Sequence, residues 1–337
     1  MLRNLTLQLL VVVLVLALAA WWVRSQLVTP YYGAASAETF VDIPRGSTTD
    51  SIAASLSNAG VLRHRLPFQL YVRWTGAGRR LQAGEYRFSV PATPVQVVQR
   101  LMQGDVFFYA ITIPEGLTAQ ETIDEITRYG LGDPGEMERA LHRTEWIRDL
   151  APNAQTLEGY LFPDTYRFGR KSTSEQILHA MVDQFRIRIT RLVAEHPLRP
   201  GWTIARLVTL ASLIEKEVSN RDERYMVASV FDNRIEKGMR LACDPTVIYA
   251  LKLTGKYDGN IHKRDLQIES PYNTYVHVGL PPSPIANPGL DSLRAALAPP
   301  KTDYLYFVSR NDGTHQFSKD FRAHESAVSR FQRHSRR

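Results

Sequence analysis

The sequence predicts an α+β protein that begins with a transmembrane helix. An uncharged apolar run stands at the N-terminus, short strand and helix patterns follow it, and longer helices with long loops make up the rest. Strands and helices in separate runs are typical of α+β folds. A chain of 337 residues also has room for about two domains, each with its own core.

The N-terminal apolar run, Leu5 to Val23, lies between Arg3 and Arg24 and is about as long as a bilayer core is thick. Ala17-Leu18-Ala19 is compatible with signal-peptidase cleavage, which is the alternative interpretation. The run is longer than the apolar region of most signal peptides, and Trp21-Trp22 resemble interfacial anchors, so we expect an uncleaved anchor. The expected division of the chain is an anchor (1–24), a linker (25–38), a small α+β subdomain (39–108), a larger mixed α+β domain (109–332) and a basic tail (333–337).

Composition excludes several classes of function. Cys243 is the only cysteine, so the chain has no intramolecular disulfide and no cysteine-based zinc site, and the nine histidines lack a metal-ligand spacing. We therefore expect no metal and no cofactor. The 41 basic and 34 acidic residues give a net charge of +7, which favours anionic polymers or lipid head groups. Nucleic acid is not expected as a partner, because the anchor predicts an exported chain.

Between residues 39 and 108 the pattern predicts two strands and two helices. The expected strands are Phe40–Ile43 and Gly84–Val90, and the expected helices are Asp50–Leu56 and Val95–Met102. The run Ile43-Pro44-Arg45-Gly46-Ser47-Thr48 has an echo in Ile113-Pro114-Glu115-Gly116-Leu117-Thr118. This weak internal repeat is explained equally well by a turn that carries a helix cap.

After about residue 108 the predicted helices are longer. A capping box at Ser172-Thr173-Ser174-Glu175 starts a helix that runs to about Glu195. The other expected elements are helices at Thr203–Val218, Arg221–Lys237 and Asp291–Ala298, and a terminal hairpin of Tyr304–Ser309 and Gln316–Ser318 around Asn311-Asp312-Gly313.

The helix Thr203–Val218 carries an ionisable group where an apolar residue is expected. On a helical wheel Glu215 lies about 20° from Ile204, whereas Glu217 points about 160° away, beside Arg206. A carboxyl on the packed face is desolvated and keeps its proton, which suits a general acid. The alternative is a structural ion pair in the core.

Three loops are rich in aromatic, acidic and amide side chains. They are Leu157–Tyr166, Asp244–Tyr249 and Pro271–Gly289, and the third is stiffened by prolines. Long ordered loops are often binding sites. Tyrosines beside asparagine and aspartate also suit a sugar, which offers apolar ring faces and hydroxyl groups, so these loops indicate a carbohydrate groove.

These motifs resemble one known family. Leu210-Ala211-Ser212-Leu213-Ile214-Glu215-Lys216-Glu217, Val230-Phe231-Asp232-Asn233-Arg234, Asp244-Pro245-Thr246-Val247, Tyr272-Asn273-Thr274-Tyr275 and Gly279-Leu280-Pro281-Pro282 are similar to motifs of the endolytic murein transglycosylases, the MltG or YceG-like family. So are Glu158–Tyr166 and Tyr304–Val308, and the resemblance covers residues 39 to 330. One departure is Ala242-Cys243, where polar residues are expected.

The resemblance implies a single-pass protein of the cytoplasmic (inner) membrane with its catalytic domain on the extracytoplasmic side. Residues 39–108 would be a LysM-like subdomain and 109–332 the YceG-like catalytic domain, with Glu215 as the essential acid. The implied activity is endolytic cleavage of the MurNAc–GlcNAc bond in nascent peptidoglycan, which leaves a 1,6-anhydroMurNAc end and terminates glycan elongation. Peptidoglycan synthases and transpeptidases are candidate partners. The candidate substrate-binding residues are Glu158, Tyr160, Asn233, Asp244, Thr246, Tyr272, Asn273 and Tyr275.

Two alternatives remain open from the sequence. The first is a hydrolytic muramidase, in which Glu158 or Asp244 supplies the second carboxyl that glycoside hydrolysis ordinarily needs. The second is a non-catalytic peptidoglycan-binding scaffold of the cell-wall synthesis machinery.

Overall fold

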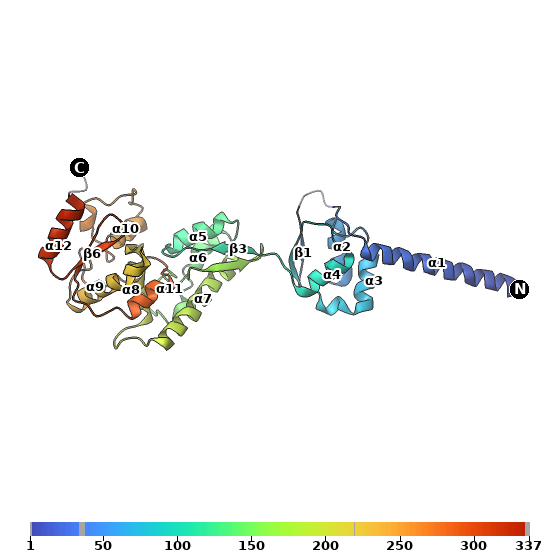
Figure 1. The fold of residues 1–337 in the computed structure, drawn as a ribbon, viewed down its shortest axis with the longest axis horizontal. Coiled ribbons are helices and arrows are strands. Elements are labelled where there is room, and N and C mark those ends of the chain that lie inside the picture. Colours follow the sequence, from blue (N-terminus) through green and yellow to red (C-terminus); the bar gives the residue numbers. More distant parts are fainter. Residues whose placement is uncertain (1, 34–37, 219, 334–337) are drawn as a thin grey trace. The chain divides into compact units, whose positions relative to one another are not determined.

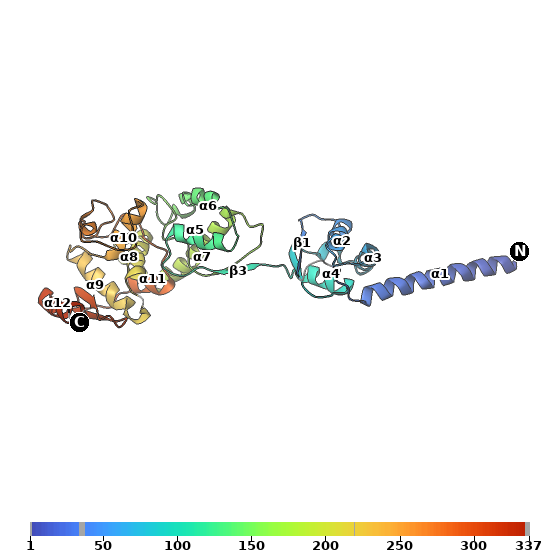
Figure 2. The same cartoon turned by 90° about the horizontal axis from the view of Figure 1, so that it is seen from above.

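The computed structural model describes residues 2–33, 38–218 and 220–333. The end of the expected basic tail, residues 334–337, and residues 34–37 of the expected linker lie outside these ranges. The chain divides into two compact units (Figures 1 and 2). Unit 1 comprises Met1–Tyr109 with Arg167–Lys171, and unit 2 comprises Ala110–Tyr166 with Ser172–Arg337.

Unit 1 begins with the long apolar helix α1 (Leu2–Val28). Its stretch Thr6–Val28 is 23 residues long with a mean hydropathy of 2.4, which is long and apolar enough to cross a membrane. The rest of the unit is a two-stranded antiparallel sheet with three helices. These elements are β1 (Thr39–Ile43), α2 (Thr49–Asn58), α3 (Arg65–Thr75), β2 (Gly84–Phe88) and α4 (Pro94–Gln103).

The core of unit 1 is built from one face of each element. In the sheet, Thr39 pairs with Phe88 and Ile43 with Gly84, which turns Val41, Ile43 and Phe88 inward. Leu56 of α2, Phe68 of α3 and Leu101 of α4 complete a single apolar cluster. Both expected strands and both expected helices are present within two residues of their predicted bounds.

Helix α3 was not expected from the sequence. Pro67 interrupts its apolar pattern, but it lies in the first turn of the helix, where proline removes no intrahelical hydrogen bond. Gly76 ends the helix in the left-handed conformation, with φ of +66°.

Unit 2 is mostly helical. Its helices are α5 (Ala119–Arg128), α6 (Pro134–Ala140), α7 (Ser174–Glu195), α8 (Ile204–Glu217), α9 (Arg224–Glu236), α10 (Asp244–Leu253), α11 (Leu290–Leu297) and α12 (Phe321–Val328). Short 3₁₀ turns occur at Ala77–Arg80 in unit 1 and at Thr144–Ile147, Arg221–Glu223 and Asp265–Gln267 in unit 2, where a π turn spans Ser329–Arg333. The remaining strands are β3 (Tyr109–Thr112) paired with β4 (Thr165–Phe168), and β5 (Tyr306–Ser309) paired antiparallel with β6 (His315–Ser318).

The repeated turn motif forms the same structure twice. Gly46 and Gly116 both have φ of +79°, a backbone conformation that glycine adopts without steric cost. The two threonines that follow, Thr48 and Thr118, cap α2 and α5 by accepting hydrogen bonds from Ser51 N–H and Glu121 N–H. A helix-capping turn therefore accounts for the motif.

One predicted loop is wrong. Residues Asp244–Tyr249 were expected to be irregular, but they form the first half of α10, with Pro245 in its first turn. Proline is favoured at that position because it lacks only an N–H that would have no partner there. The capping box before α7 also lies one residue later than expected, since Thr173 and Gln176 make the two reciprocal bonds.

The centre of unit 2 is helix α8, which packs against α9, α10 and α11 (Figure 1). Thr203 caps its start by accepting a bond from Arg206 N–H, and every residue from Leu207 to Ile214 is buried. The last residues of this helix, Glu215 to Glu217, therefore follow directly on a fully buried helical segment that holds them in place.

Candidate active site

Glu215 occupies the packed face of α8, as the helical wheel predicts, and its side chain is only 5% exposed. Its Oε1 accepts a hydrogen bond of 2.8 Å from Arg224, and its Oε2 accepts one of 3.0 Å from the backbone N–H of Gly289. Both oxygens are thus occupied by N–H donors, one of which is a cation. This arrangement is a charge-assisted contact that leaves neither oxygen without a donor.

The guanidinium of Arg224, at the start of α9, lies close to several carboxylates. Its side chain is 6% exposed and lies 3.3 Å from Glu115 and 3.8 Å from Asp291, in addition to Glu215. The sequence did not single out Arg224. A buried ion-pair network of this kind is the structural alternative that was considered for Glu215, and it joins α8, α9, α11 and the turn before α5.

Glu217, the last residue of α8, lies in a different environment from the one expected. The wheel placed it beside Arg206, away from the packed face, but the structure buries it in part. Its Oε2 accepts a weak bond of 3.3 Å from the Cys243 thiol, and Oε1 has no hydrogen-bond partner among the described residues. Burial raises the pKa of Glu217, and the nearby charge of Asp244 adds to this, while His315 and Arg234 oppose it.

The wheel gave no reason to expect this burial of Glu217, because a wheel describes a helix alone. The segments that surround this helix end, Cys243–Asp244 and His315, come from distant parts of the chain. Glu217 has the property that a general acid requires: its carboxyl is desolvated, has no ion-pair partner within the described chain and is still partly open to solvent.

Asp244 and Tyr275 form the open wall next to Glu217. The Tyr275 hydroxyl donates a bond of 2.5 Å to Asp244 Oδ1, and Asp244 itself is exposed at the start of α10. Ala242, just before this wall, has φ of +47°, which is uncommon for a residue with a side chain. A hydrogen bond from Ala242 N–H to the carbonyl of Thr274 holds that conformation.

Thr246 and Asn273 are fully buried behind this wall. Thr246 Oγ1 donates to the carbonyl of Cys243 and shares a bond of 2.9 Å with Thr274 Oγ1. Asn273 Nδ2 donates to the carbonyls of Leu266 and Ile268. Both residues were expected to bind substrate, but in this structure they hold the wall in place and are closed to a ligand.

Two other candidates lie in the interior. Tyr160 is 1% exposed and packs edge-on against Phe185, with ring centroids 5.2 Å apart. Glu158 is 5% exposed, and its carboxyl receives bonds from Ala119 N–H and from the Tyr249 hydroxyl. Burial raises the pKa of Glu158 to about 8. Neither side chain is available to a substrate here.

Tyr272 and Asn233 are partly exposed. The Tyr272 hydroxyl lies 2.6 Å from Ser283 Oγ, and its ring lies 5.0 Å from the ring of Tyr249. Asn233 Nδ2 donates to the carbonyls of Thr302 and Tyr304, so its amide ties α9 to the strand region that follows. Of the predicted substrate-binding residues, Asp244 is exposed, and Asn233, Tyr272 and Tyr275 are partly exposed.

Asn287, which the sequence did not single out, joins the first and third of the polar loops. Its Oδ1 accepts bonds from Gly159 N–H and Leu161 N–H, and its Nδ2 donates to the carbonyl of Leu117 and to Thr122 Oγ1. The residue is 1% exposed. An asparagine in a proline-rich loop was the only sequence signal, and nothing in it indicated four distant partners.

No cluster of histidine, cysteine, aspartate and glutamate suited to a metal occurs among the described residues. The arrangement that remains is a protonatable carboxyl at the open end of α8, Glu217, beside the wall formed by Asp244 and Tyr275. It can donate a proton to an oxygen of a bound molecule and take one back.

Comparison with known proteins gives a consistent result. The YceG-like family matches residues 41–330 of the chain. The endolytic murein transglycosylase of Bacillus subtilis is 36% identical over 307 residues, which cover 86% of this chain and 84% of the relative.

The endolytic murein transglycosylase of Streptococcus pneumoniae is 28% identical over 300 residues, covering 80% of this chain but only 54% of that longer protein. Among solved structures, a yceG-like protein from Listeria monocytogenes is 33% identical, with a TM-score of 0.57. That similarity covers 86% of this chain and 99% of the Listeria chain.

Proposed function

The chain belongs to the YceG-like family, and from this premise we propose that it is an endolytic murein transglycosylase, a lyase that cleaves peptidoglycan strands. The family match, which spans most of the chain, supports the reaction class. Within the molecule, the observation that carries the proposal is one desolvated carboxyl with no ion-pair partner at the end of the central helix, Glu217.

We assign the acid role to Glu217 rather than to Glu215, which the sequence favoured. A general acid must hold a proton before it reacts, and the raised pKa of Glu217 favours the protonated form. Glu215 has an Arg224 guanidinium at 2.8 Å, and its second oxygen is occupied as well. Its proposed task is to position the end of α8 through α9 and Gly289.

One carboxyl is enough because the substrate brings its own nucleophile. The 6-hydroxyl oxygen of N-acetylmuramic acid attacks C1 of the same sugar, and the bond from C1 to the leaving oxygen of N-acetylglucosamine breaks. Glu217 gives its proton to that oxygen and, as the carboxylate, takes the proton of the 6-hydroxyl. An intramolecular nucleophile has a high effective concentration, and no water is consumed.

The test is to compare Glu217→Gln with Glu215→Gln in release of anhydro-muropeptides by the purified protein. Glutamine keeps the volume of glutamate but has no acidic proton, so Glu217→Gln should lower the rate by roughly 10² to 10⁴ without loss of folding. Glu215→Gln leaves the Arg224 charge without its best partner and should lower the free energy of unfolding by about 3–5 kcal/mol.

A double variant, Glu215→Gln with Arg224→Met, serves as the control for folding. It removes the buried charge as well, so it should recover part of the lost stability and retain more activity than Glu217→Gln. If folded Glu215→Gln is inactive while Glu217→Gln still cleaves strands, Glu215 is the acid and the assignment made here is wrong.

A hydrolytic muramidase is the second candidate, since Asp244 lies close enough to act on the pKa of Glu217 and could serve as the second carboxyl. Mass spectrometry of the released fragments separates the two reactions, because the anhydro end is one water lighter than the hydrolysed end. A pure scaffold would release no fragments at all.

We also propose that α1 anchors the protein in the cytoplasmic membrane, with both units on the extracytoplasmic side. The support is the length and hydropathy of Thr6–Val28 and the exposure of Trp21 and Trp22. Intact-mass analysis of the membrane fraction should find a chain that keeps its N-terminus. A mature chain that begins at Ala20 would mean that the segment is a cleaved signal peptide.

The remaining expectations belong to the same proposal. Unit 1 would act as a LysM-like module that binds glycan, and peptidoglycan synthases or transpeptidases would be protein partners. These roles follow from the family resemblance and from the position of unit 1 next to the anchor in the sequence.

A further inference from the structure

Helix α3 of unit 1 carries an exposed apolar stripe. Leu66, Leu70 and Trp74 are spaced by four residues, so they share one side of the helix. They are 51%, 41% and 83% exposed, whereas Phe68 and Val72 on the opposite side are buried in the core. Single exposed apolar residues are ordinary, but three along one helix form a continuous surface.

Arginines surround this stripe. Arg65, Arg73, Arg79 and Arg80 are all exposed, and no acidic partner is recorded for any of them within the described chain. Leu66, Leu70, Arg73 and Arg79 line one groove, together with Asp50 at the start of α2. The Asp50 carboxylate accepts a bond of 2.9 Å from Gln69 and is the one acidic side chain of that groove.

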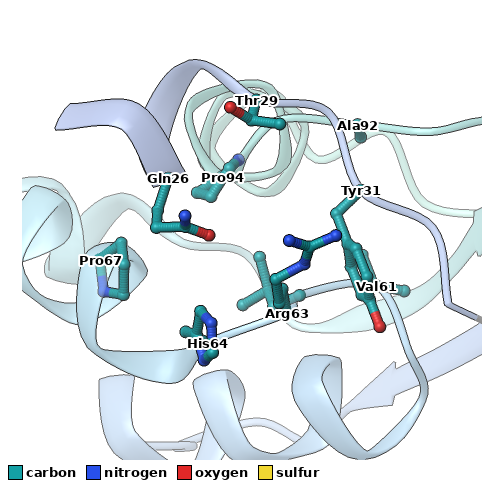
Figure 3. A pocket seen from close by; sticks show the side chains of 10 residues that line it. Gln26, Thr29, Tyr31, Val61, Arg63, His64, Pro67, Ala92 and Pro94 are labelled. Atoms are coloured by element: carbon teal, nitrogen blue, oxygen red, sulfur yellow. The ribbon is translucent and has the colours of Figure 1, made fainter. Parts of the chain in front are cut away.

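The same helix begins beside the C-terminal end of α1. Figures 1 and 2 both show the two helices next to each other, and the rings of Trp22 and His64 lie 5.4 Å apart. Figure 3 shows Gln26 of α1 facing His64 and Pro67 across a small pocket, with Arg63 next to Tyr31. The Arg63 guanidinium lies 5.0 Å from the centre of the Tyr31 ring.

The contact between Trp22 and His64 indicates how close α3 lies to the membrane. Trp22 lies one residue before Val23, the last residue of the uncharged run that ends at Arg24. If the run Leu5–Val23 is embedded, Trp22 lies at its end, and His64 and the start of α3 lie at the level of the lipid head groups. Tryptophan and arginine are the side chains favoured at that level.

We propose that α3 is a second membrane contact, in which Leu66, Leu70 and Trp74 enter the interface of an anionic lipid surface. The surrounding arginines bind the phosphates of the lipid head groups. Apolar insertion and charge attraction together are the two components of interfacial binding by amphipathic helices. The contact fixes unit 1 on the membrane surface and rests on the proposed anchoring by α1.

The experiment uses the full chain in vesicles that contain a phospholipid with a photoreactive group near its head. Vesicles are made of phosphatidylcholine alone or with added phosphatidylglycerol, and cross-linked peptides are identified by mass spectrometry. Peptides that contain Leu66 to Arg79 should be labelled, and labelling should increase when phosphatidylglycerol is present.

Two pairs of substitutions separate the two components. Leu70→Ser with Trp74→Ser should lower α3 labelling by roughly tenfold in both kinds of vesicle. Arg73→Gln with Arg79→Gln should remove the increase caused by phosphatidylglycerol and leave the labelling in neutral vesicles. Ile187→Ser on α7, where Ile187 is 63% exposed, is the matched control and should change nothing at α3.

Labelling at Trp21–Trp22 reports the anchor separately. If α1 is labelled and α3 is not, the second contact is refuted while the anchor stands. If neither is labelled, the anchor itself fails. Labelling of α3 that is unaffected by both substituted pairs would also refute the proposal, as it would show chance proximity to lipid.

Discussion

At the scale of single residues, unit 2 contains two carboxyls whose pKa values are raised by burial, Glu158 and Glu217. The two carboxyls differ in whether a substrate can reach them. Glu158 is enclosed by Ala119 and Tyr249, whereas Glu217 stands at the open end of α8. Burial alone therefore does not identify the acid, and the access of a substrate decides between the two.

The raised pKa of Glu158 predicts a pH dependence of stability. Its folded-state value of about 8 exceeds the ordinary value of 4.5, so between these values the folded state binds more protons than the unfolded state. The contribution of Glu158 to the free energy of unfolding should be largest at the acidic end of this range. It should decrease as pH rises, by up to about 1.4 kcal/mol per pH unit.

Glu158→Gln tests this dependence, since a neutral amide keeps both hydrogen bonds. Melting temperatures of the variant, measured from pH 5 to pH 8, should be flatter than those of the original protein and higher at the alkaline end. Glu138→Gln is the control, because Glu138 is exposed. An unchanged slope in Glu158→Gln would mean that another group causes the dependence.

Sequence reasoning reached part of this site. The periodicity of α8 placed Glu215 on the packed face correctly, because that information is local to the helix. It could not find Arg224, the partner of Glu215, or the segment around Cys243 that covers Glu217. Those contacts depend on how segments from outside α8 pack against it, and a helical wheel contains no information about them.

At the scale of elements, helix ends with capping residues were predicted best. The starts of α2, α5 and α7 carry threonine caps, and the end of α4 carries Gly104 in the left-handed conformation. Of the helices with a proline near the start, α4 was predicted, whereas α3 and α6 were missed and α10 was interpreted as a loop. Proline disfavours a helix interior but is accepted in its first turn, so its meaning depends on an unknown boundary.

Gly159, in the first polar loop, is expected to tolerate no side chain. Its φ is +90°, and an added Cβ would lie 2.4 Å from Cβ of Pro284 and 3.1 Å from Cγ1 of Val208. Pro284 is rigid and cannot move away. Gly159→Ala should therefore lower the free energy of unfolding by about 3 kcal/mol or more, through backbone strain and overpacking together.

Urea unfolding of the full chain measures this effect, with Gly169→Ala as the control. An added Cβ at Gly169 meets no atom within 4 Å, so its midpoint should stay close to that of the original protein. Equal midpoints for both variants would show that the loop around Gly159 adapts more readily than its contacts indicate.

At the scale of the whole molecule, each unit has an apolar core of its own. The α+β class with an N-terminal apolar helix was predicted from composition and pattern alone. Chain connectivity was harder to predict, since Arg167–Lys171 returns to unit 1 from within the sequence of unit 2. No local pattern marks such a return.

Deletion of residues 39–108 separates the tasks of the two units. If unit 1 binds glycan by itself, the shortened protein should attach less to sacculi and still cleave short soluble strands at close to the original rate. Pelleting with sacculi measures the first property, and release of anhydro-muropeptides measures the second. Equal loss of both in a folded protein would mean that unit 1 completes the active site.

The hydrogen bonds of the Asn287 side chain restrict which residues can replace it. Its amide uses both donor and acceptor positions, so aspartate cannot donate the required bonds, leucine can make none, and glutamine is a methylene too long. In a library of all single substitutions, position 287 should therefore be among the few in these loops where every alternative is depleted.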